Sequence, residues 1–303
     1  MKINCVVVTY NRLDLLKECL KALEEQTFRI HKIFIINNHS TDQTATYLEN
    51  LKEDPNYDIT NLPENIGGAG GFSEGIKRAA MDGCDWIWVM DDDTIPHKNA
   101  LEELIKATKA APNIGFICSK VIWTDGKVHE MNVPRFDLHS PDGFPLNYYS
   151  DKADVLMVKS ASFVSILIST ETVRSIGLPI KEFFIWGDDT EYTTRIYNSG
   201  YTCLYAGQSV ALHKTKTNYV SNIKSVPADS FWKFKYGIRN ELYLRKGRKS
   251  KLIFFFSALN FYRRQIRHAK KRKKSERKEL IRIVRKSFWK GFSFKPTIEY
   301  LPE

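Results

Sequence analysis

The sequence predicts an α/β domain followed by a helical, basic C-terminal extension. In the first third of the 303-residue chain, short apolar runs alternate with amphipathic segments of helical period. Strands that alternate with helices in this way form parallel sheets. From about Pro227 the pattern becomes helical, and the segment from Arg245 to Lys295 holds 20 of the 46 Lys and Arg but two of the 35 Asp and Glu. The chain is long enough for one large core with an appendage.

The individual elements follow from local period and from helix boundary signals. In the first part we expect strands at Ile3–Val8, Lys32–Ile36 and Trp86–Met90, and helices at Leu13–Glu25, Thr44–Glu53, Ser73–Met81 and Asn99–Ala110. In residues 113–215 we expect strands at Gly115–Val121, Asp154–Ser160, Val164–Ser169 and Thr202–Ala206, and a helix at Asp189–Ser199. This pattern predicts one domain over 1–226 with halves 1–112 and 113–226, and a second region over 227–303.

Cysteine usage and hydropathy indicate the compartment. The five cysteines are odd in number and widely spaced in apolar runs, which predicts neither a disulfide framework nor a zinc site. The N-terminus enters a strand pattern at once, unlike a signal peptide, and no apolar stretch reaches the ~18–20 residues of a membrane span. We therefore expect a cytoplasmic protein that is soluble or peripheral.

Three adjacent acids follow the apolar run Trp86–Met90. Residues two apart on an extended segment point the same way, so Asp91 and Asp93 are placed to act on one cation that offsets their repulsion. Hard oxygen ligands suit Mg²⁺ or Mn²⁺ bound together with substrate phosphates. The alternative is an exposed acidic turn that caps the next helix. The position at a strand end favours function, because ligands of α/β sheets bind beyond the carboxyl ends of strands. We expect the loops Thr9–Arg12, Asn37–Asp42 and Asp91–Thr94 to meet there.

A second acidic group follows an aromatic run at 183–186. Gly187 precedes Asp188, Asp189 and Glu191, and acids in a first helical turn ordinarily cap free amides. Capping alone does not account for the preceding aromatic run, and one of these carboxylates can act as a general base on an acceptor hydroxyl. His213 taken alone is a structural histidine; beside a cation site it becomes a candidate third ligand.

A glycine-rich segment precedes the expected helix at Ser73. Glycine allows close approach of a ligand, and the amides of a helix N-terminus attract anions. The spacing matches neither the dinucleotide fingerprint nor the P-loop, and a plain tight turn is the alternative. Asparagines at the first two strand ends can pair with a nucleobase edge. The candidate ligand-binding residues of this part are Thr9, Arg12, Asn37, Asn65, Gly67, Gly68, Gly70, Gly71 and Phe72.

Together these segments resemble glycosyltransferase family 2, and within it the branch of galactofuranosyltransferases and some rhamnosyltransferases. The segments that carry the resemblance are Val6–Arg12, Ile36–Asp42, Asn65–Phe72, Asp91–Asp93, Trp186–Tyr192 and His213. The resemblance covers roughly residues 3–215 and implies the GT-A fold, a Rossmann-like mixed sheet with helices on both faces. Residues 1–112 would be its nucleotide-sugar half and 113–226 its acceptor half.

The resemblance also implies residue roles. It makes Asp91, Asp93 and His213 ligands of Mn²⁺ or Mg²⁺, and Asp189 the catalytic base of an inverting single displacement. Asp92 would lie close to the nucleotide sugar, and Thr9, Arg12 and Asn37 near the nucleoside. Trp186, Asp188 and Glu191 would position the sugars.

The donor implied by the glycine run is UDP-galactofuranose rather than dTDP-rhamnose. Two departures bear on this: Asn37 stands where family members commonly have Asp, and Gly187 separates Trp186 from the acid pair. The first leaves the choice between uracil and thymine open, and the second leaves the acceptor site open. The acceptor is expected to be a glycan or a lipid-linked saccharide.

The basic and aromatic tail predicts binding to an anionic membrane surface, at the inner face of the cell membrane. The alternative is that these helices pack on the core or on a partner subunit. In the second case the protein would be a homo-oligomer. Nucleic acid is disfavoured because no recognition module accompanies the charge. Two other function classes remain: a sugar nucleotidyltransferase, which would need a basic glycine-rich loop at the first strand end, and a catalytically silent scaffold, which would not need Asp91, Asp93 and Asp189.

Overall fold

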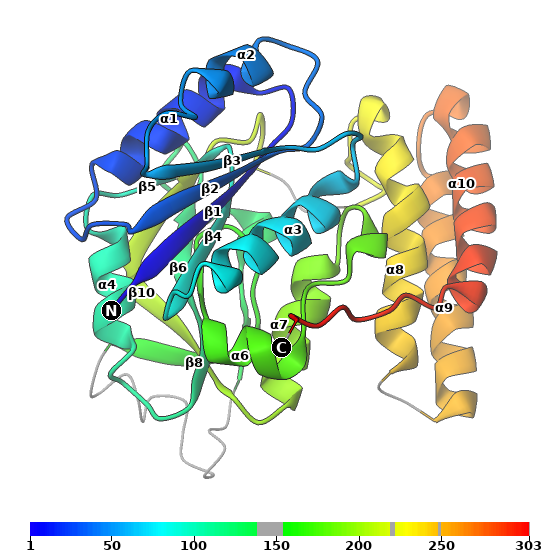
Figure 1. Ribbon diagram of the computed structural model, residues 1–303. Helices are drawn as coiled ribbons and strands as arrows, with labels where there is room; N and C mark the ends of the chain where they lie inside the picture. Colours follow the sequence, from blue (N-terminus) through cyan, green and yellow to red (C-terminus); the bar gives the residue numbers. More distant parts are fainter. Residues whose placement is uncertain (138–153, 219–221, 248–249, 303) are drawn as a thin grey trace.

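The computed structural model describes residues 1–137, 154–218, 222–247 and 250–302 (Figure 1). Ten strands of these residues join in one mixed sheet in the order β3-β2-β1-β4-β9-β6-β10-β8-β7, with β5 paired to β10. The strands are β1 (Ile3–Thr9), β2 (Lys32–Asn37), β3 (Tyr57–Asn61), β4 (Trp86–Asp91), β5 (Thr94–Pro96), β6 (Ile114–Ile122), β7 (Arg135–Phe136), β8 (Val155–Ser160), β9 (Ile166–Ser169) and β10 (Thr202–His213). The first four strands along the sheet pair in parallel, whereas β9 runs antiparallel to both β4 and β6.

Helices cover both faces of this sheet (Figure 1). On one face pack α1 (Leu13–Glu24), α2 (Thr44–Glu49) and α4 (Ala100–Ala107). On the other face pack α3 (Gly67–Met81), α6 (Thr170–Ile176) and α7 (Asp188–Asn198). Helix α1 buries its apolar face, as its amphipathic period predicted. The buried residues are Leu16, Cys19, Leu20 and Leu23. The predicted α/β fold with a mixed sheet is confirmed.

The glycine run is helical, which corrects the predicted start of this helix at Ser73. Helix α3 begins at Gly67. A Cβ on Gly71 would come within 2.6 Å of Val8 Cγ1, so the absence of side chains lets α3 approach β1 closely. The amides of Gly67 and Ala69 are bonded to Asn65 Oδ1 and to Phe184 O. These two amides, which were expected to be free to bind an anion, are therefore already hydrogen-bonded within the protein.

The C-terminal region forms a separate helical layer beside the sheet (Figure 1). It contains η3 (Ala228–Lys233), α8 (Phe234–Lys246), α9 (Lys251–Lys270) and α10 (Lys274–Ser293), which share one apolar cluster. The chain then returns to the sheet domain, where Glu299 accepts from Lys77 Nζ at 2.6 Å and from Lys181 Nζ at 3.1 Å. The short η1 (Glu130–Asn132) and η2 (Lys181–Phe183) lie in the sheet domain.

In the parts of the chain that the structure describes, none of the helices is both long enough and apolar enough to span a membrane.

Candidate active site

The polar loops after β1, β2 and β4 meet at the carboxyl edge of the sheet, as predicted. Arg12 Nη1 lies 2.7 Å from Asp93 Oδ2 and 3.3 Å from Asp92 Oδ1. Asn11 N donates to Ser40 Oγ at 3.0 Å and so joins the first two loops. Parallel strands place their carboxyl ends at one edge, which explains why loops distant in sequence converge here.

Asp91, Asp93 and His213 form a candidate cation site. One ligand atom from each of the three lies within 4.8 Å of the others. Asp91 ends β4, and antiparallel pairing of β5 with β10 sets Thr94 opposite His213. Lys214 N donates to Asp93 O at 2.8 Å and fixes the turn that holds the carboxylate. Two carboxylates and an imidazole suit a divalent cation of the Mn²⁺ type.

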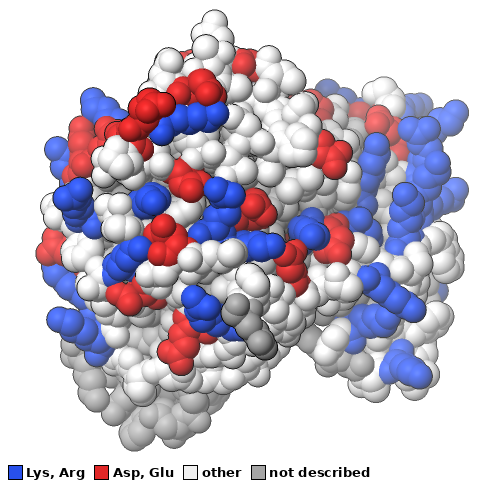
Figure 2. Space-filling view, viewed as in Figure 1, with Lys and Arg blue, Asp and Glu red and all other residues white. Residues whose placement is uncertain are grey.

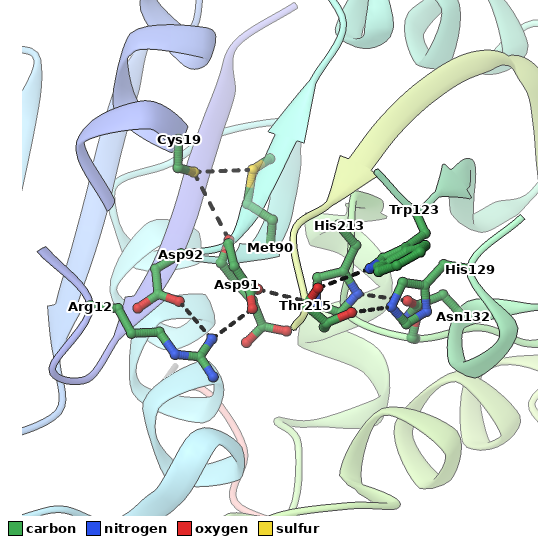
Figure 3. Close-up of polar contacts among 12 residues, drawn as sticks. Arg12, Cys19, Met90, Asp91, Asp92, Trp123, His129, Asn132, His213 and Thr215 are labelled. Carbon is green, nitrogen blue, oxygen red and sulfur yellow. Dashed lines mark hydrogen bonds and ion pairs between the residues drawn. The ribbon is translucent and has the colours of Figure 1, made fainter. Parts of the chain in front are cut away.

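A tautomer argument tests whether these residues fit a cation. Asn132 Nδ2 donates to Ser162 Oγ at 2.9 Å, so its Oδ1 accepts from His213 Nδ1 at 2.8 Å (Figure 3). The neutral ring therefore keeps its lone pair on Nε2, which lies 3.1 Å from Asp93 Oδ1. Apart from this imidazole nitrogen, that buried carboxylate oxygen has no hydrogen-bond donor among the described residues. A proton on Nε2 would join the two atoms by a hydrogen bond, and a bound cation would instead have both atoms as ligands.

The pKa values of the three adjacent aspartates also favour a bound cation. Burial, with repulsion from Asp93 and Asp92, raises the pKa of Asp91 well above its ordinary value. Burial likewise raises the pKa of Asp92 to about 6. Although burial opposes it, contact with His213 and Arg12 holds the pKa of Asp93 at about 2. A divalent cation would relieve this crowding of carboxyl groups.

The cation site opens into a cavity of about 360 Å³, which we call the catalytic cavity. The predicted residues that line it are Arg12, Gly68, Phe72, Asp91, Asp93, Trp186, Asp188, Asp189 and His213. Residues from the start of the chain, from α7 and from the end of β10 thus share one space. The two acidic motifs and His213 are brought together as the sequence predicted.

Asp188 and Asp189 differ in their surroundings at the start of α7. Burial and the neighbouring Asp189 raise the pKa of Asp188 to about 8. Burial also raises the pKa of Asp189, but its Oδ1 accepts from Thr190 N at 2.6 Å and from Thr190 Oγ1 at 3.2 Å. These donors stabilise the charged form of Asp189. Asp188 therefore holds a proton more readily than Asp189, and Asp189 is the better placed of the two to accept one.

The turn at 183–186, which precedes these acids, has a strained backbone and is hydrogen-bonded to a side chain of the C-terminal region. Phe184 and Trp186 both have φ of 65°, a left-handed conformation that bulky residues rarely adopt. The buried Asn240 Nδ2 lies 2.9 Å, 3.1 Å and 2.8 Å from the carbonyl oxygens of Phe183, Ile185 and Trp186. One side chain of α8 thus fixes the turn that presents Asp188 and Asp189.

Several predicted nucleotide-side residues lie around the catalytic cavity but do not line it. Thr9 Oγ1 donates to Asp92 Oδ2 at 2.8 Å, and Asn37 Nδ2 donates to Asn61 Oδ1 at 2.7 Å. Asn37 Oδ1 also accepts from Ser40 N at 3.0 Å. These polar groups bond to one another within the protein, and the nucleoside contacts expected of Thr9 and Asn37 stay a prediction. Five more of the predicted residues also do not line the catalytic cavity: Asn65, Gly67, Gly70, Gly71 and Asp92.

Glu191 also differs from the expectation that it positions a sugar. It forms an ion pair with Arg195, whose Nη2 lies 2.9 Å from Glu191 Oε2. Arg195 Nη2 also donates to Leu178 O at 2.9 Å. Glu191 lines a different cavity, so the structure assigns it to the packing of α7.

Three residues at the site were missed by sequence reasoning. Asn132 orients His213, Asn240 holds the turn before Asp188, and Lys233 lines the catalytic cavity from η3. Burial and the nearby Arg12 lower the pKa of Lys233. All three lie in segments without a motif, and no pattern in the sequence marks them.

Comparison with curated proteins yields three informative relatives. The chain is 27% identical over 207 residues to galactofuranosyltransferase GlfT1 of Mycolicibacterium smegmatis, covering 66% of this chain and 68% of that protein. It is 29% identical over 218 residues to GlfT1 of Mycobacterium tuberculosis, covering 66% and 67%. It is 30% identical over 115 residues to poly-beta-1,6-N-acetyl-D-glucosamine synthase of Staphylococcus aureus, covering 38% and 27%.

Solved structures share the fold. The crystal structure of S. aureus TarS matches with a TM-score of 0.55 at 17% identity, over 97% of this chain and 44% of TarS. The crystal structure of GalNAc-T7 with UDP, GalNAc and Mn²⁺ matches with a TM-score of 0.61 at 14% identity, over 97% of this chain and 56% of that chain. This chain thus spans about half the length of each. The sequence profile described as glycosyl transferase family 2 matches residues 5–165, more than half of the chain. The chain is a glycosyltransferase and belongs to glycosyl transferase family 2.

Proposed function

We propose that this protein is a metal-dependent, inverting glycosyltransferase that moves galactofuranose from UDP-galactofuranose to a glycan or lipid-linked saccharide. The observation that carries the proposal is the catalytic cavity, in which the candidate cation site and Asp189 face one space. Glycosyltransferase relatives imply a nucleotide-sugar donor and a glycan acceptor. Galactofuranosyltransferases among them favour the furanose donor and a role in cell-surface polysaccharide synthesis.

Asp91, Asp93 and His213 would hold the cation, Mn²⁺ or Mg²⁺. When bound, such an ion offsets the charge that develops on a leaving diphosphate. Lys233 and Arg12 reach the same cavity from distant parts of the chain and would add positive charge near the donor phosphates. Arg12 also forms ion pairs with Asp92 and Asp93.

Asp189 would remove the proton from the acceptor hydroxyl. The hydrogen bonds from Thr190 favour the charged form of this carboxylate and fix its direction. An acceptor oxygen activated from the α7 side attacks the anomeric carbon opposite to the diphosphate held at the β4 side. This arrangement accounts for inversion in one displacement.

Each part of the chain has a role in this proposal. Residues 1–226 would form the catalytic domain, with a nucleotide-sugar half at 1–112 and an acceptor half at 113–226. Of these, 138–153 and 219–221 lie outside the described residues. The contacts of Lys233 and Asn240 bring the region 227–303 into the active site as well.

The same region carries a surface that fits an anionic membrane at the cytoplasmic face. Lys and Arg gather on the helical layer, whereas charges of both signs alternate on the sheet domain (Figure 2). At the start of α9 and the end of α10, Leu252, Phe256 and Trp289 are 70%, 62% and 69% exposed. We call Leu252, Ile253, Phe255, Phe256 and Trp289 the apolar tip. Exposed aromatic side chains flanked by basic residues favour insertion at a lipid interface.

The test is turnover of a panel of UDP- and dTDP-sugars with and without Mn²⁺. Selective, Mn²⁺-dependent hydrolysis or transfer of UDP-galactofuranose supports the proposal. Turnover of dTDP-rhamnose alone keeps the mechanism and replaces the donor. No metal-dependent binding of any donor would overturn the proposal.

A further inference from the structure

A second cavity adjoins the catalytic cavity on the far side of Trp186. It encloses about 470 Å³ between the start of α7 and helices α8 and α9. Trp186, Gly187 and Thr190 line both cavities, so the two meet at the residues next to Asp189. A molecule that presents a hydroxyl to Asp189 would therefore extend into this second space.

The walls of this cavity combine aromatic and polar side chains. Trp186 is packed edge-on against Phe234 at 5.0 Å between ring centroids, which fixes the indole at the junction. Phe261 of α9 also lines the cavity, and Glu241 and Gln265 supply polar groups. Aromatic faces with a few convergent polar groups are the usual lining of a site for a partly apolar, hydroxyl-bearing ligand.

One end of the cavity is strongly basic. Arg264 and His268 lie one helical turn apart on α9 and both line it. Burial and the nearby cations of Lys224, Arg264, Lys271 and Arg267 lower the pKa of His268, which shows how closely positive charge is gathered here. The carboxylate in the wall, Glu241, is already paired with Arg245 Nη2 at 2.6 Å. Among the described residues, no carboxylate lies within ion-pair distance of Arg264.

We propose that this second cavity is the acceptor site, and that Arg264 and His268 bind a phosphate group carried by the acceptor. The inference rests on the proposed function, because it takes Asp189 as the base. The saccharide would lie between Trp186 and Phe261, with its reactive hydroxyl at Asp189 and its phosphate at the basic end. Donor phosphates belong to the other side of Trp186, at the candidate cation site.

The probe for this site is decyl phosphate, titrated by calorimetry into the full chain saturated with UDP and Mg²⁺ so that the donor side is filled. The variant combines Arg264→Gln with His268→Gln. The control is Arg263→Gln, which removes an equal charge from an exposed neighbour on α9 that does not line the cavity. We expect the wild type and the control to bind decyl phosphate alike, and the double variant to bind at least tenfold more weakly.

Two further arms identify the source of the phosphate. Inorganic phosphate should bind at least tenfold more weakly than decyl phosphate; equal affinity would mean a free-anion site and would overturn the acceptor assignment. Affinity for phosphatidylglycerol vesicles should be equal in the double variant and in Arg263→Gln. A selective loss in the double variant would mean that these two side chains serve membrane binding, which also overturns the acceptor assignment.

Donor hydrolysis separates this inference from the proposed function. We expect Arg263→Gln to hydrolyse the donor at the wild-type rate, while the KM of the double variant for a phosphate-bearing acceptor rises at least tenfold. A wild type that hydrolyses the donor but does not bind decyl phosphate sinks the acceptor site alone. A wild type that hydrolyses no donor sinks the proposed function, whatever decyl phosphate does.

Discussion

Asn132 Oδ1 lies 2.8 Å from His213 Nδ1, and this contact turns the Nε2 lone pair of His213 toward Asp93 Oδ1. The imidazole is thereby held in the tautomer that can bind a cation. Removing such a partner typically lowers metal affinity about 10–100-fold.

Asn132→Ala should therefore lower the affinity for Mn²⁺ by roughly that factor. Mn²⁺ titration followed by electron paramagnetic resonance measures this without turnover. Asn50→Ala, on the exposed end of α2, is the matched control and should bind Mn²⁺ as the wild type does. Wild-type affinity in Asn132→Ala would contradict the orienting role.

Asp189→Asn should reduce transfer about 10²–10⁴-fold while donor binding is kept, because it removes the base but not the cation site. Asp188→Asn should retain most of the transfer rate at pH 7, since Asp188 with a pKa of about 8 is already protonated there. Steady-state rates and donor binding for both variants check this. If Asp188→Asn proves the more damaging change, the base has been assigned to the wrong neighbour.

Folding stability should depend on Asp188 in a defined direction. Its folded-state pKa of about 8 lies above the ordinary value of 3.8, so the folded chain holds a proton that the unfolded chain has released. This linkage lowers the free energy of unfolding as pH rises from about 4 to 8. In EDTA, Asp188→Asn should be the more stable protein at pH 8 by about 2–5 kcal/mol and close to wild type at pH 4.

Denaturant unfolding at the two pH values measures the effect. Asp14→Asn, at an exposed position of α1, should follow the wild-type pH dependence. An Asp188→Asn curve parallel to the wild-type curve would show that this carboxyl is not buried as described.

Asn240→Ala should destabilise the protein by about 1–3 kcal/mol, because it leaves the carbonyl oxygens of Ile185 and Trp186 without their side-chain donor. It should also lower kcat at least tenfold, since the turn before Asp188 and Asp189 loses its support. Asn240→Leu roughly keeps the volume but not the donor, and should behave like the alanine variant. Unfolding and rate measurements on both variants separate loss of the donor from loss of packing.

Replacing Phe255 and Phe256 by serine should weaken binding to phosphatidylglycerol vesicles at least tenfold, since each buried phenyl ring contributes about 1.5–3 kcal/mol. Vesicle sedimentation measures this. Met81→Ser, which changes an equally exposed apolar residue at the end of α3, should have no effect. Unchanged binding of the double variant would remove the apolar tip from the membrane proposal.

The strongly apolar strands and the acidic motifs were predictable from the sequence. The strands β1, β2 and β4 begin where their apolar runs begin and extend one residue further than expected, onto Thr9, Asn37 and Asp91. A polar residue at a strand end breaks the apolar pattern although its backbone continues the ladder. Strand β3, with the sequence Tyr-Asp-Ile-Thr-Asn, was missed for the same reason, because it lies at the edge of the sheet and needs little apolar surface.

The site was predictable where a motif marks it and not where tertiary contacts make it. Strand β10 was expected to end at Ala206, but it resumes after an irregularity between Ala206 and Val210 and carries His213 to the cation site. Lys233 and Asn240 reach the site from a region that the sequence presented as a basic appendage. Their roles depend on the packing of α8 against the turn before α7, which no local pattern encodes.

The bonds from Asn240 to the turn at 183–186 bear on how acceptor preference can be re-engineered or can diverge among related enzymes. A chimaera with its crossover near residue 226 would combine Asp188 and Asp189 of one parent with the α8 residue of the other parent that bonds the turn at 183–186. In such a hybrid the turn and the side chain that supports it would not match. Recombination that respects this coupling has to exchange Phe183–Asn198 and α8 as a single block.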